Sequence, residues 1–201
     1  MFYTNIHSEA LRFGDIVAGY ILATPKIKRP FLELGNHQYN VDIELSQFSV
    51  ILSPSCSIGE RKILISPLRI VRKTFFDNDY FNNDLTRINR QMEQQYIYPP
   101  STIARMTEEE KREKLTSDIV WTLVELFIYD QHDLLPAYQI RRRGENQEIR
   151  YYMVDFRDVT KVNCEQIVNA EDSPLTCKIL QLSDQTRLEL SDKIQNFYKR
   201  A

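Results

Sequence analysis

Two short apolar runs, each closed by a Ser-Pro step, constrain the fold of this chain more than any other feature. Residues 50–52 (Val-Ile-Leu) and 63–65 (Ile-Leu-Ile) have the aliphatic composition of buried strands, and Ser53 and Ser66, each followed by proline, come directly after them. Proline has no amide hydrogen to donate to a sheet, and it forces the preceding residue into extended geometry. Each step is therefore expected to mark where a strand leaves the sheet.

Further strands are predicted from alternation and composition. Val41, Ile43 and Leu45 alternate with polar residues, which indicates a half-buried strand running into the first apolar run. Residues 119–129 are long enough for a strand or a buried helix, and their β-branched and aromatic content favours a strand. The other predicted strands cover residues 11–22, 138–143, 147–154 and 159–162, with residues 144–146 as a three-residue hairpin loop.

The helical signals lie in the middle of the chain and at its end. Residues 84–95 carry a narrow apolar stripe, and Thr107 with Glu110 has the spacing of a capping box, so a second helix is expected from there to about residue 117. Residues 77–117 are therefore predicted to be a helical insertion. Residues 183–198 are predicted to form a closing helix that Ser183 or Asp184 caps.

Composition narrows the classes of function. A chain of 201 residues with a net charge of −2 suits one well-cored domain and gives no whole-protein electrostatic argument for binding nucleic acid. Three scattered cysteines and three scattered histidines form no metal-ligand pattern, and no cofactor motif is present. With neither a signal peptide nor an apolar membrane span in the sequence, we expect a cytoplasmic protein without a cofactor or a metal.

The candidate chemical groups are few. Cys56 lies in the loop after the first apolar run, but a nucleophilic thiolate needs a base or a lowered pKa, and its neighbours are hydroxyl groups, so a structural thiol is favoured. Arg29, in a basic connection, and Arg141 and Arg143, near a hairpin tip, are candidates for contacts with RNA phosphates. A solvated loop and a solvated hairpin are the simpler interpretations of these basic residues.

Aspartates raise a second chemical hypothesis. Asp15, Asp155 and Asp158 suggest paired carboxylates for acid–base or metal chemistry, but their spacing matches no known motif. Asp15 follows a glycine and is better explained as a turn residue that binds its own backbone.

Three segments carry a family resemblance. Residues 13–17 (Phe-Gly-Asp-Ile-Val), 50–53 (Val-Ile-Leu-Ser) and 63–68 (Ile-Leu-Ile-Ser-Pro-Leu) resemble the three-strand signature of the MazF/PemK-like toxins. The chain also resembles an uncharacterised bacterial group in which the central strand ends Leu-Ser-x-Ser-Cys-Asp, with Ser57 here at the acidic position. The resemblance implies a small SH3-like β-barrel and a bacterial ribonuclease ancestry.

The departures from that family bear on activity. The family carries an Arg-Pro pair just before the central strand, and a Thr or Ser directly after a Pro-Ile pair. Here Phe48 precedes the central strand, and Arg69 stands where the hydroxyl is expected. RNA cleavage needs a general acid or base and a group that stabilises the phosphate, and neither position carries over. Ser66, Arg69 and Cys56 remain as catalytic candidates, and Arg29, Arg69, Arg141 and Arg143 as nucleic-acid-binding candidates.

Together these patterns predict one α+β domain. Its SH3-like β-barrel core covers residues 11–71 and 119–163, the helical insertion residues 77–117, and the closing helix residues 183–199. The predicted function is a non-catalytic binding or accessory module, with a protein partner, in a bacterial toxin–antitoxin or anti-phage type of system. A divergent RNA endonuclease and a structural assembly component stay open as alternatives, as do RNA binding and homo-oligomerisation; no membrane association is predicted.

Overall fold

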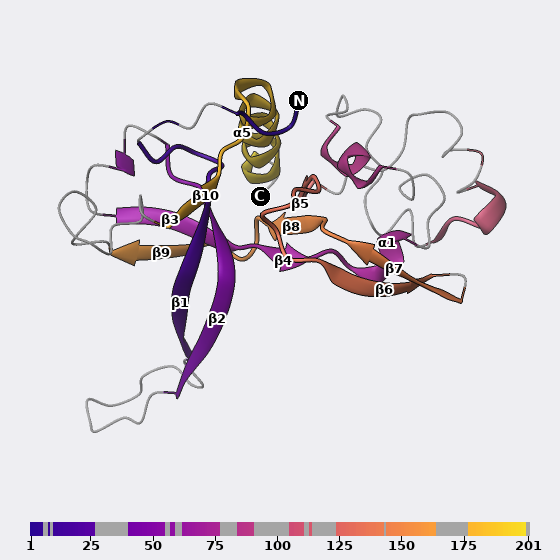
Figure 1. The fold of residues 1–201 in the computed structure, drawn as a ribbon, viewed down its shortest axis with the longest axis horizontal. Helices are drawn as coiled ribbons and strands as arrows, with labels where there is room; N and C mark the ends of the chain where they lie inside the picture. Colours follow the sequence, from indigo (N-terminus) through magenta and orange to yellow (C-terminus); the bar gives the residue numbers. More distant parts are fainter. Residues whose placement is uncertain are drawn as a thin grey trace.

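The protein is an α+β chain in which antiparallel strands build three sheets and the C-terminal segment forms a helix (Figure 1). This architecture confirms the class predicted from the sequence and the closing helix. The computed structural model describes residues 1–5, 8, 10–26, 40–54, 57–58, 62–76, 84–90, 105–110, 113, 124–142, 144–163 and 177–199.

The largest sheet has five strands in the order β10-β1-β2-β3-β9. Its members are β1 (Ile16–Lys26), β2 (Asn40–Ile51), β3 (Lys62–Pro67), β9 (Thr160–Asn163) and β10 (Lys178–Leu180). Ile51 pairs with Ile65, so the two apolar runs lie side by side. The first Ser-Pro exit is confirmed, because β2 ends before Ser53. At the second Ser-Pro step, Pro67 still pairs with Ser49, so the chain leaves this sheet one residue later than predicted.

Two smaller sheets complete the β structure. One has the order β4-β8-β5, with β4 (Arg69–Ile70), β5 (Leu126–Tyr129) and β8 (Tyr152–Asp155); the other pairs β6 (Tyr138–Arg142) with β7 (Glu145–Ile149). A single residue, Leu68, separates β3 from β4, so one bent segment contributes a strand to two sheets. The described strands do not close into one barrel.

The bend has a counterpart in the neighbouring segment. Ile65 pairs with Thr160 in the first sheet, and Arg69 pairs with Met153 in the second. The β8–β9 segment therefore carries a few extra residues at the bend, where a turn links the Asp158 amide to the Asp155 carbonyl. We call this place, where both segments change sheets, the strand switch.

The predicted hairpin is present but differs in its bounds. Arg142 pairs with Glu145, so two residues rather than three lie between the strands. Gly144 has a φ of 89°, and two-residue hairpin turns require positive φ, which explains the tighter turn. The predicted strand 147–154 is wrong as one element, because β7 ends at Ile149 and β8, in another sheet, begins at Tyr152.

The predicted helical insertion lies mostly outside the described residues. Of the helix predicted over residues 84–95, residues 84–90 are described, and they form a short 3₁₀ helix, η2 (Leu85–Asn89), capped by Asp84 and ended by Arg90, whose ψ is 131°. The capping box is confirmed, because the Thr107 amide donates to Glu110 Oε2 at 2.7 Å and the Glu110 amide donates back to Thr107 Oγ1 at 3.2 Å. A four-residue helix, α1 (Lys73–Phe76), follows β4.

The closing helix α5 (Asp184–Tyr198) agrees with the sequence prediction, including its cap. The Ser183 side chain accepts from the Thr186 amide, which satisfies one of the unpaired N–H groups of the first turn. Leu190 is fully buried in the main core, with Phe127 and Val154. No helix among the described residues is long and apolar enough to cross a membrane.

η2 is held from two sides. The Asn89 side-chain amide donates to the Ile128 carbonyl at 2.6 Å and accepts from the Ile128 amide at 2.7 Å, on the edge of β5 that faces away from β8. The buried Lys193 ammonium of α5 donates to the Ile88 carbonyl. Together these contacts fix η2 between the β5 edge and α5.

Candidate functional site

The strand switch gathers the described candidate residues of the central region. Ser66 ends β3 and Arg69 begins β4, while Asp155 and Asp158 lie across from them on the β8–β9 segment. The sequence analysis named these residues separately, and only the strand pairing of the structure brings them together. Arg29, Cys56 and Arg143 lie outside the described residues, and Arg141 is exposed on β6, in a different sheet.

Charges at the strand switch are paired. Arg69 donates to Asp158 Oδ2 from Nη2 at 2.5 Å and from Nε at 3.2 Å. Arg157 donates to both carboxylate oxygens of Asp155, at 2.8 and 2.5 Å, and Arg72 lies 3.7 Å from the same group. Partial burial raises the pKa of Asp155, but the Arg157 hydrogen bonds and the charge of Arg72 bring it below its ordinary value.

Ser66 is inaccessible. Its side chain is fully buried, and Oγ lies 3.4 Å from the Asp155 carbonyl oxygen. A hydroxyl nucleophile needs a base within hydrogen-bond reach and an open approach for its substrate. Ser66 has a carbonyl partner instead of a base, so it is not placed to act as a nucleophile. The charged groups of the strand switch bind one another, which is a structural arrangement.

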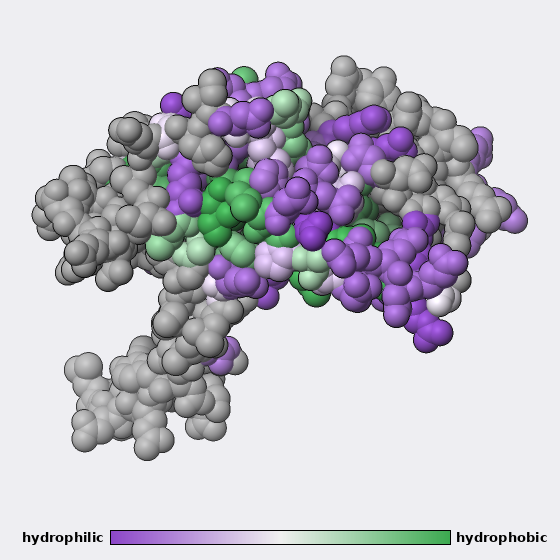
Figure 2. All heavy atoms as spheres, viewed as in Figure 1, coloured by the Kyte–Doolittle hydropathy of each residue, from purple (hydrophilic) through white to green (hydrophobic). Residues whose placement is uncertain are grey.

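A larger feature lies beside α5. A groove of about 660 Å³ lies between one face of α5 and residues in or next to β1, β2, β3 and β9 of the five-stranded sheet. On the side of the molecule that Figure 2 draws, hydrophobic residues gather near the centre, between hydrophilic ones. The described lining residues are mostly apolar: Phe13, Leu52, Pro54, Leu64, Val159, Arg187, Leu188, Ser191, Ile194, Gln195, Tyr198 and Lys199.

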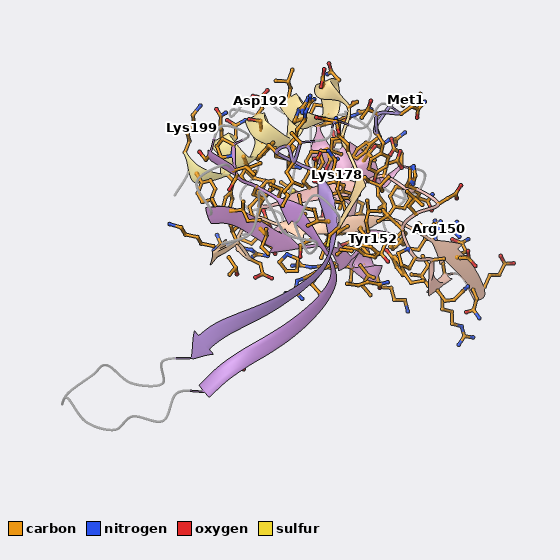
Figure 3. The ribbon with its side chains drawn as sticks, turned by 60° about the vertical axis from the view of Figure 1, so that its left-hand side comes forward. Met1, Arg150, Tyr152, Lys178, Asp192 and Lys199 are labelled. Carbon is orange, nitrogen blue, oxygen red and sulfur yellow. The ribbon has the colours of Figure 1, made fainter. Side chains whose placement is uncertain are left out.

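The apolar surface of this groove is exposed. Leu188 is 63% exposed, Tyr198 54% and Leu64 37%, although side chains of these types usually find cover. The charged residues among the described lining, Arg187 and Lys199, are both basic, and Lys199 points outward at the end of α5 (Figure 3). Arg187 donates to Asp184 on the same helix. The α5 groove therefore offers an apolar floor bordered by Lys199 and by this ion pair.

Sequence reasoning missed this groove, although one signal was present. Leu188, Leu190, Ile194 and Tyr198 make the apolar stripe of the closing helix wider than one buried face requires. The structure divides the stripe, because Leu190 enters the core and Leu188 remains outside. Excess apolar width on a terminal helix was the available indication of a second contact surface.

Asp15 has a second role besides the predicted turn. Its Oδ2 accepts from the Arg12 amide at 2.8 Å, which confirms the turn interpretation, and from Lys178 Nζ at 2.7 Å. The side chains of both members of this ion pair are almost fully buried, with 1% of Asp15 and 6% of Lys178 exposed. Burial raises the pKa of Asp15, and the Lys178 ammonium partly offsets the rise. This ion pair ties β10 to the start of β1.

No family model matches the chain, and no curated protein or solved structure gives a significant match to it.

Proposed function

We propose that the protein is a non-catalytic binding module, an accessory subunit of a bacterial toxin–antitoxin or anti-phage type of system, built on a divergent MazF/PemK-like, SH3-like barrel. The bent β3–β4 segment supports the barrel hypothesis, because a strand shared by two sheets is how small barrels turn their corners. The family resemblance of residues 13–17, 50–53 and 63–68 points the same way.

The α5 groove is the observation that carries the proposal. Its exposed Leu64, Leu188 and Tyr198 form a contiguous apolar surface with no cover from the described part of the chain. Exposed apolar patches rimmed by polar residues are typical of protein–protein contact sites. A protein segment with apolar side chains fits this groove better than RNA does, since RNA recognition relies on basic and stacking surfaces.

The strand switch argues against the ribonuclease alternative. A cleaving site needs cationic groups that face the scissile phosphate and an acid or base beside it. Arg69 is bound to Asp158, Arg157 is bound to Asp155, and Ser66 is buried. Recruiting Arg69 for a phosphate would require breaking an existing ion pair.

An RNA assay separates the two functions. Purified wild-type protein and Arg69→Ala are incubated with structured and unstructured RNA at low salt, and both cleavage and retention are measured. We expect neither from either protein. Specific cleavage that disappears in Arg69→Ala would establish the nuclease and remove the binding-module proposal.

A second experiment addresses the groove directly. Tagged protein is isolated from its native cells, and the stoichiometric partner is compared between Leu188→Asp and the matched variant Gln185→Asp, on the same helix but outside the groove. The expected result is loss of the partner only in Leu188→Asp. Equal recovery from both variants would move the binding surface away from the groove.

A further inference from the structure

The outer edge of β5 is capped by a side chain instead of a strand. Among the described residues only β8 pairs with β5, and the Glu125 carbonyl accepts from the Phe156 amide on that side. Backbone groups of successive residues point to opposite edges of a strand, so those of Ile128 point away from β8. The Asn89 side chain binds both of them, at 2.6 and 2.7 Å. Asn89 therefore makes the two hydrogen bonds that a paired residue on a neighbouring strand would make.

The element that carries Asn89 to this edge is small. η2 has five residues, and 3₁₀ helices have poorer hydrogen-bond geometry than α-helices and rarely extend far. Leu85 and Ile88 are fully buried in the cluster that also contains Leu126 and Ile128. The position of η2 therefore depends on its contacts with β5 and α5 rather than on its own backbone hydrogen bonds.

Lys193 of α5 supplies the contact from the opposite side. The residue is only 3% exposed, and its ammonium group donates to the Ile88 carbonyl. An ion that is buried against an uncharged acceptor destabilises the arrangement that buries it. The contact that clamps η2 is therefore weakened whenever Lys193 carries a charge.

The described charged groups around Lys193 come from three elements. Burial lowers the pKa of Lys193 to about 7, and Glu125, just before β5, opposes this shift. On α5 itself, Asp192 is exposed to solvent. The remaining groups line a pocket of about 460 Å³ beside η2, and their charges balance: Asp84, Arg87, Arg90 and Glu189.

Movement of η2 away from α5 would bring Lys193 into water and change its protonation. Lys193 is largely neutral above pH 7 while it is buried, whereas a lysine in water titrates near 10.4. Between these two values the open form holds one more proton than the closed form, so closing becomes more favourable as the pH rises. Below about pH 6 both forms are charged, and the balance between them no longer depends on Lys193.

We propose that η2 is a movable cover of the β5 edge, which Lys193 clamps when it is neutral and releases when it is protonated. The open form presents the Ile128 amide and carbonyl at an uncovered strand edge, and an extended segment can add to such an edge as a further strand. This device goes beyond the proposed binding module. Neither Lys193 nor any residue of η2 is among the described lining of the α5 groove.

Amide hydrogen exchange in the full chain, followed by NMR, tests the cover at single residues. The amides of Phe127 and Tyr129 face β8, whereas the Ile128 amide faces η2. After correction for intrinsic rates, we expect the Ile128 amide to exchange at least about tenfold faster than these two neighbours, because it exchanges through local opening. Equal protection of the three amides would overturn the proposal, since η2 would then leave only when the sheet unfolds.

The pH dependence identifies the clamp. In the wild type, the protection factor of the Ile128 amide should rise roughly fifteenfold from pH 7 to 8.5 and stay constant below about pH 6. Lys193→Met and Lys193→Arg should both abolish the rise, with Ile128 more protected at pH 7 in the first variant and less protected in the second. Lys199→Met, at an exposed position near the end of the same helix, is the matched control that should keep the wild-type rise.

The variants also give the contrary outcome a clear form. A rise that persists in Lys193→Met would assign the proton to another group and remove Lys193 as the clamp. Thermal unfolding of each variant shows whether it folds. If Lys193→Arg does not fold, the comparison of Lys193→Met with Lys199→Met decides the question.

Asn89→Ala tests the cover from the side of β5. The substitution removes both hydrogen bonds to Ile128, so the protection of the Ile128 amide should fall at least about tenfold while that of Phe127 stays within about twofold. An Ile128 amide as protected as in the wild type would contradict the role of η2 as the cover of this edge.

Discussion

Lys178 and Lys193 are both buried in the C-terminal part of the chain, but their surroundings differ. Lys178 lies inside the body (Figure 3) and donates to Asp15 at 2.7 Å, to Gln181 Oε1 at 2.8 Å and to the carbonyls of Ser8 and Ala10. Among the described residues, Lys193 donates to one acceptor, the uncharged carbonyl of Ile88. Burial alone therefore does not determine how much a charge destabilises the fold, because the number and charge of its acceptors decide it.

The protonation of Lys193 reflects this difference. Burial lowers its pKa to about 7, and the negative charge of Glu125 opposes that shift without reversing it. A lysine of this kind is largely neutral above neutral pH inside the protein but charged in the unfolded chain. Lys193 therefore weakens the fold, whereas Lys178 neutralises a buried carboxylate.

The largest expected effect comes from removing the partnered lysine. Lys178→Met leaves the Asp15 carboxylate buried without its cation, and breaking one side of a buried pair costs about 3–5 kcal/mol. The free energy of unfolding, measured in urea, should fall by that order. The double variant Lys178→Met with Asp15→Asn should recover part of the loss, and additive effects would show that the two groups do not interact.

Removing Lys193, whose acceptor is an uncharged carbonyl, should have the opposite sign. Lys193→Met keeps the aliphatic bulk and removes the cost of deprotonating a buried amine, so we expect a gain of about 2–3 kcal/mol at pH 7. Urea unfolding measures the gain, and Lys199→Met, exposed on the same helix, is the matched control that should change little. Destabilisation by Lys193→Met would mean that its bond to Ile88 outweighs the burial cost.

Lys193 should also make the stability of the protein depend on pH. Between the folded pKa of about 7 and an unfolded value near 10.4, the unfolded chain holds a proton on Lys193 that the folded protein lacks. Stability therefore rises with pH in this window, by about 2 kcal/mol from pH 7 to 9. The slope should disappear in Lys193→Met, and a slope that persists there belongs to another group.

The smallest effect is expected at the strand switch. Arg69 and Asp158 form a short ion pair, but their side chains are 43% and 39% exposed, and such pairs contribute less than about 1 kcal/mol. Arg69→Met should therefore change the free energy of unfolding only slightly, and less at high salt. A loss as large as that of Lys178→Met would make the strand switch a core element.

Local patterns predicted much of the fold. The Ser183 cap, the Thr107–Glu110 capping box and the strand character of the two apolar runs follow from short-range chemistry that a sequence displays directly. The extra residues opposite β3–β4 could not be predicted, because Phe156 and its neighbours resemble an ordinary strand end until the register is known. Register between distant segments is set by tertiary contacts.

The candidate site was less predictable. The proximity of Ser66, Arg69 and Asp158 follows from which strands pair, and no spacing in the sequence encodes it. Lys193 did leave a signal, because it falls on the same helix face as Leu190 and Phe197, at separations of three and four residues. A lysine within an apolar stripe is an indication of a buried amine.

Asn89 has a consequence for the solubility of the folded protein. β5 has the sequence Leu-Phe-Ile-Tyr, an uncharged run of high β-propensity, and it lies at the edge of its sheet within the described residues. Such edges template intermolecular stacking and fibril growth. By occupying both backbone groups of Ile128, the Asn89 amide blocks the centre of that edge, so one short side chain protects the protein against aggregation.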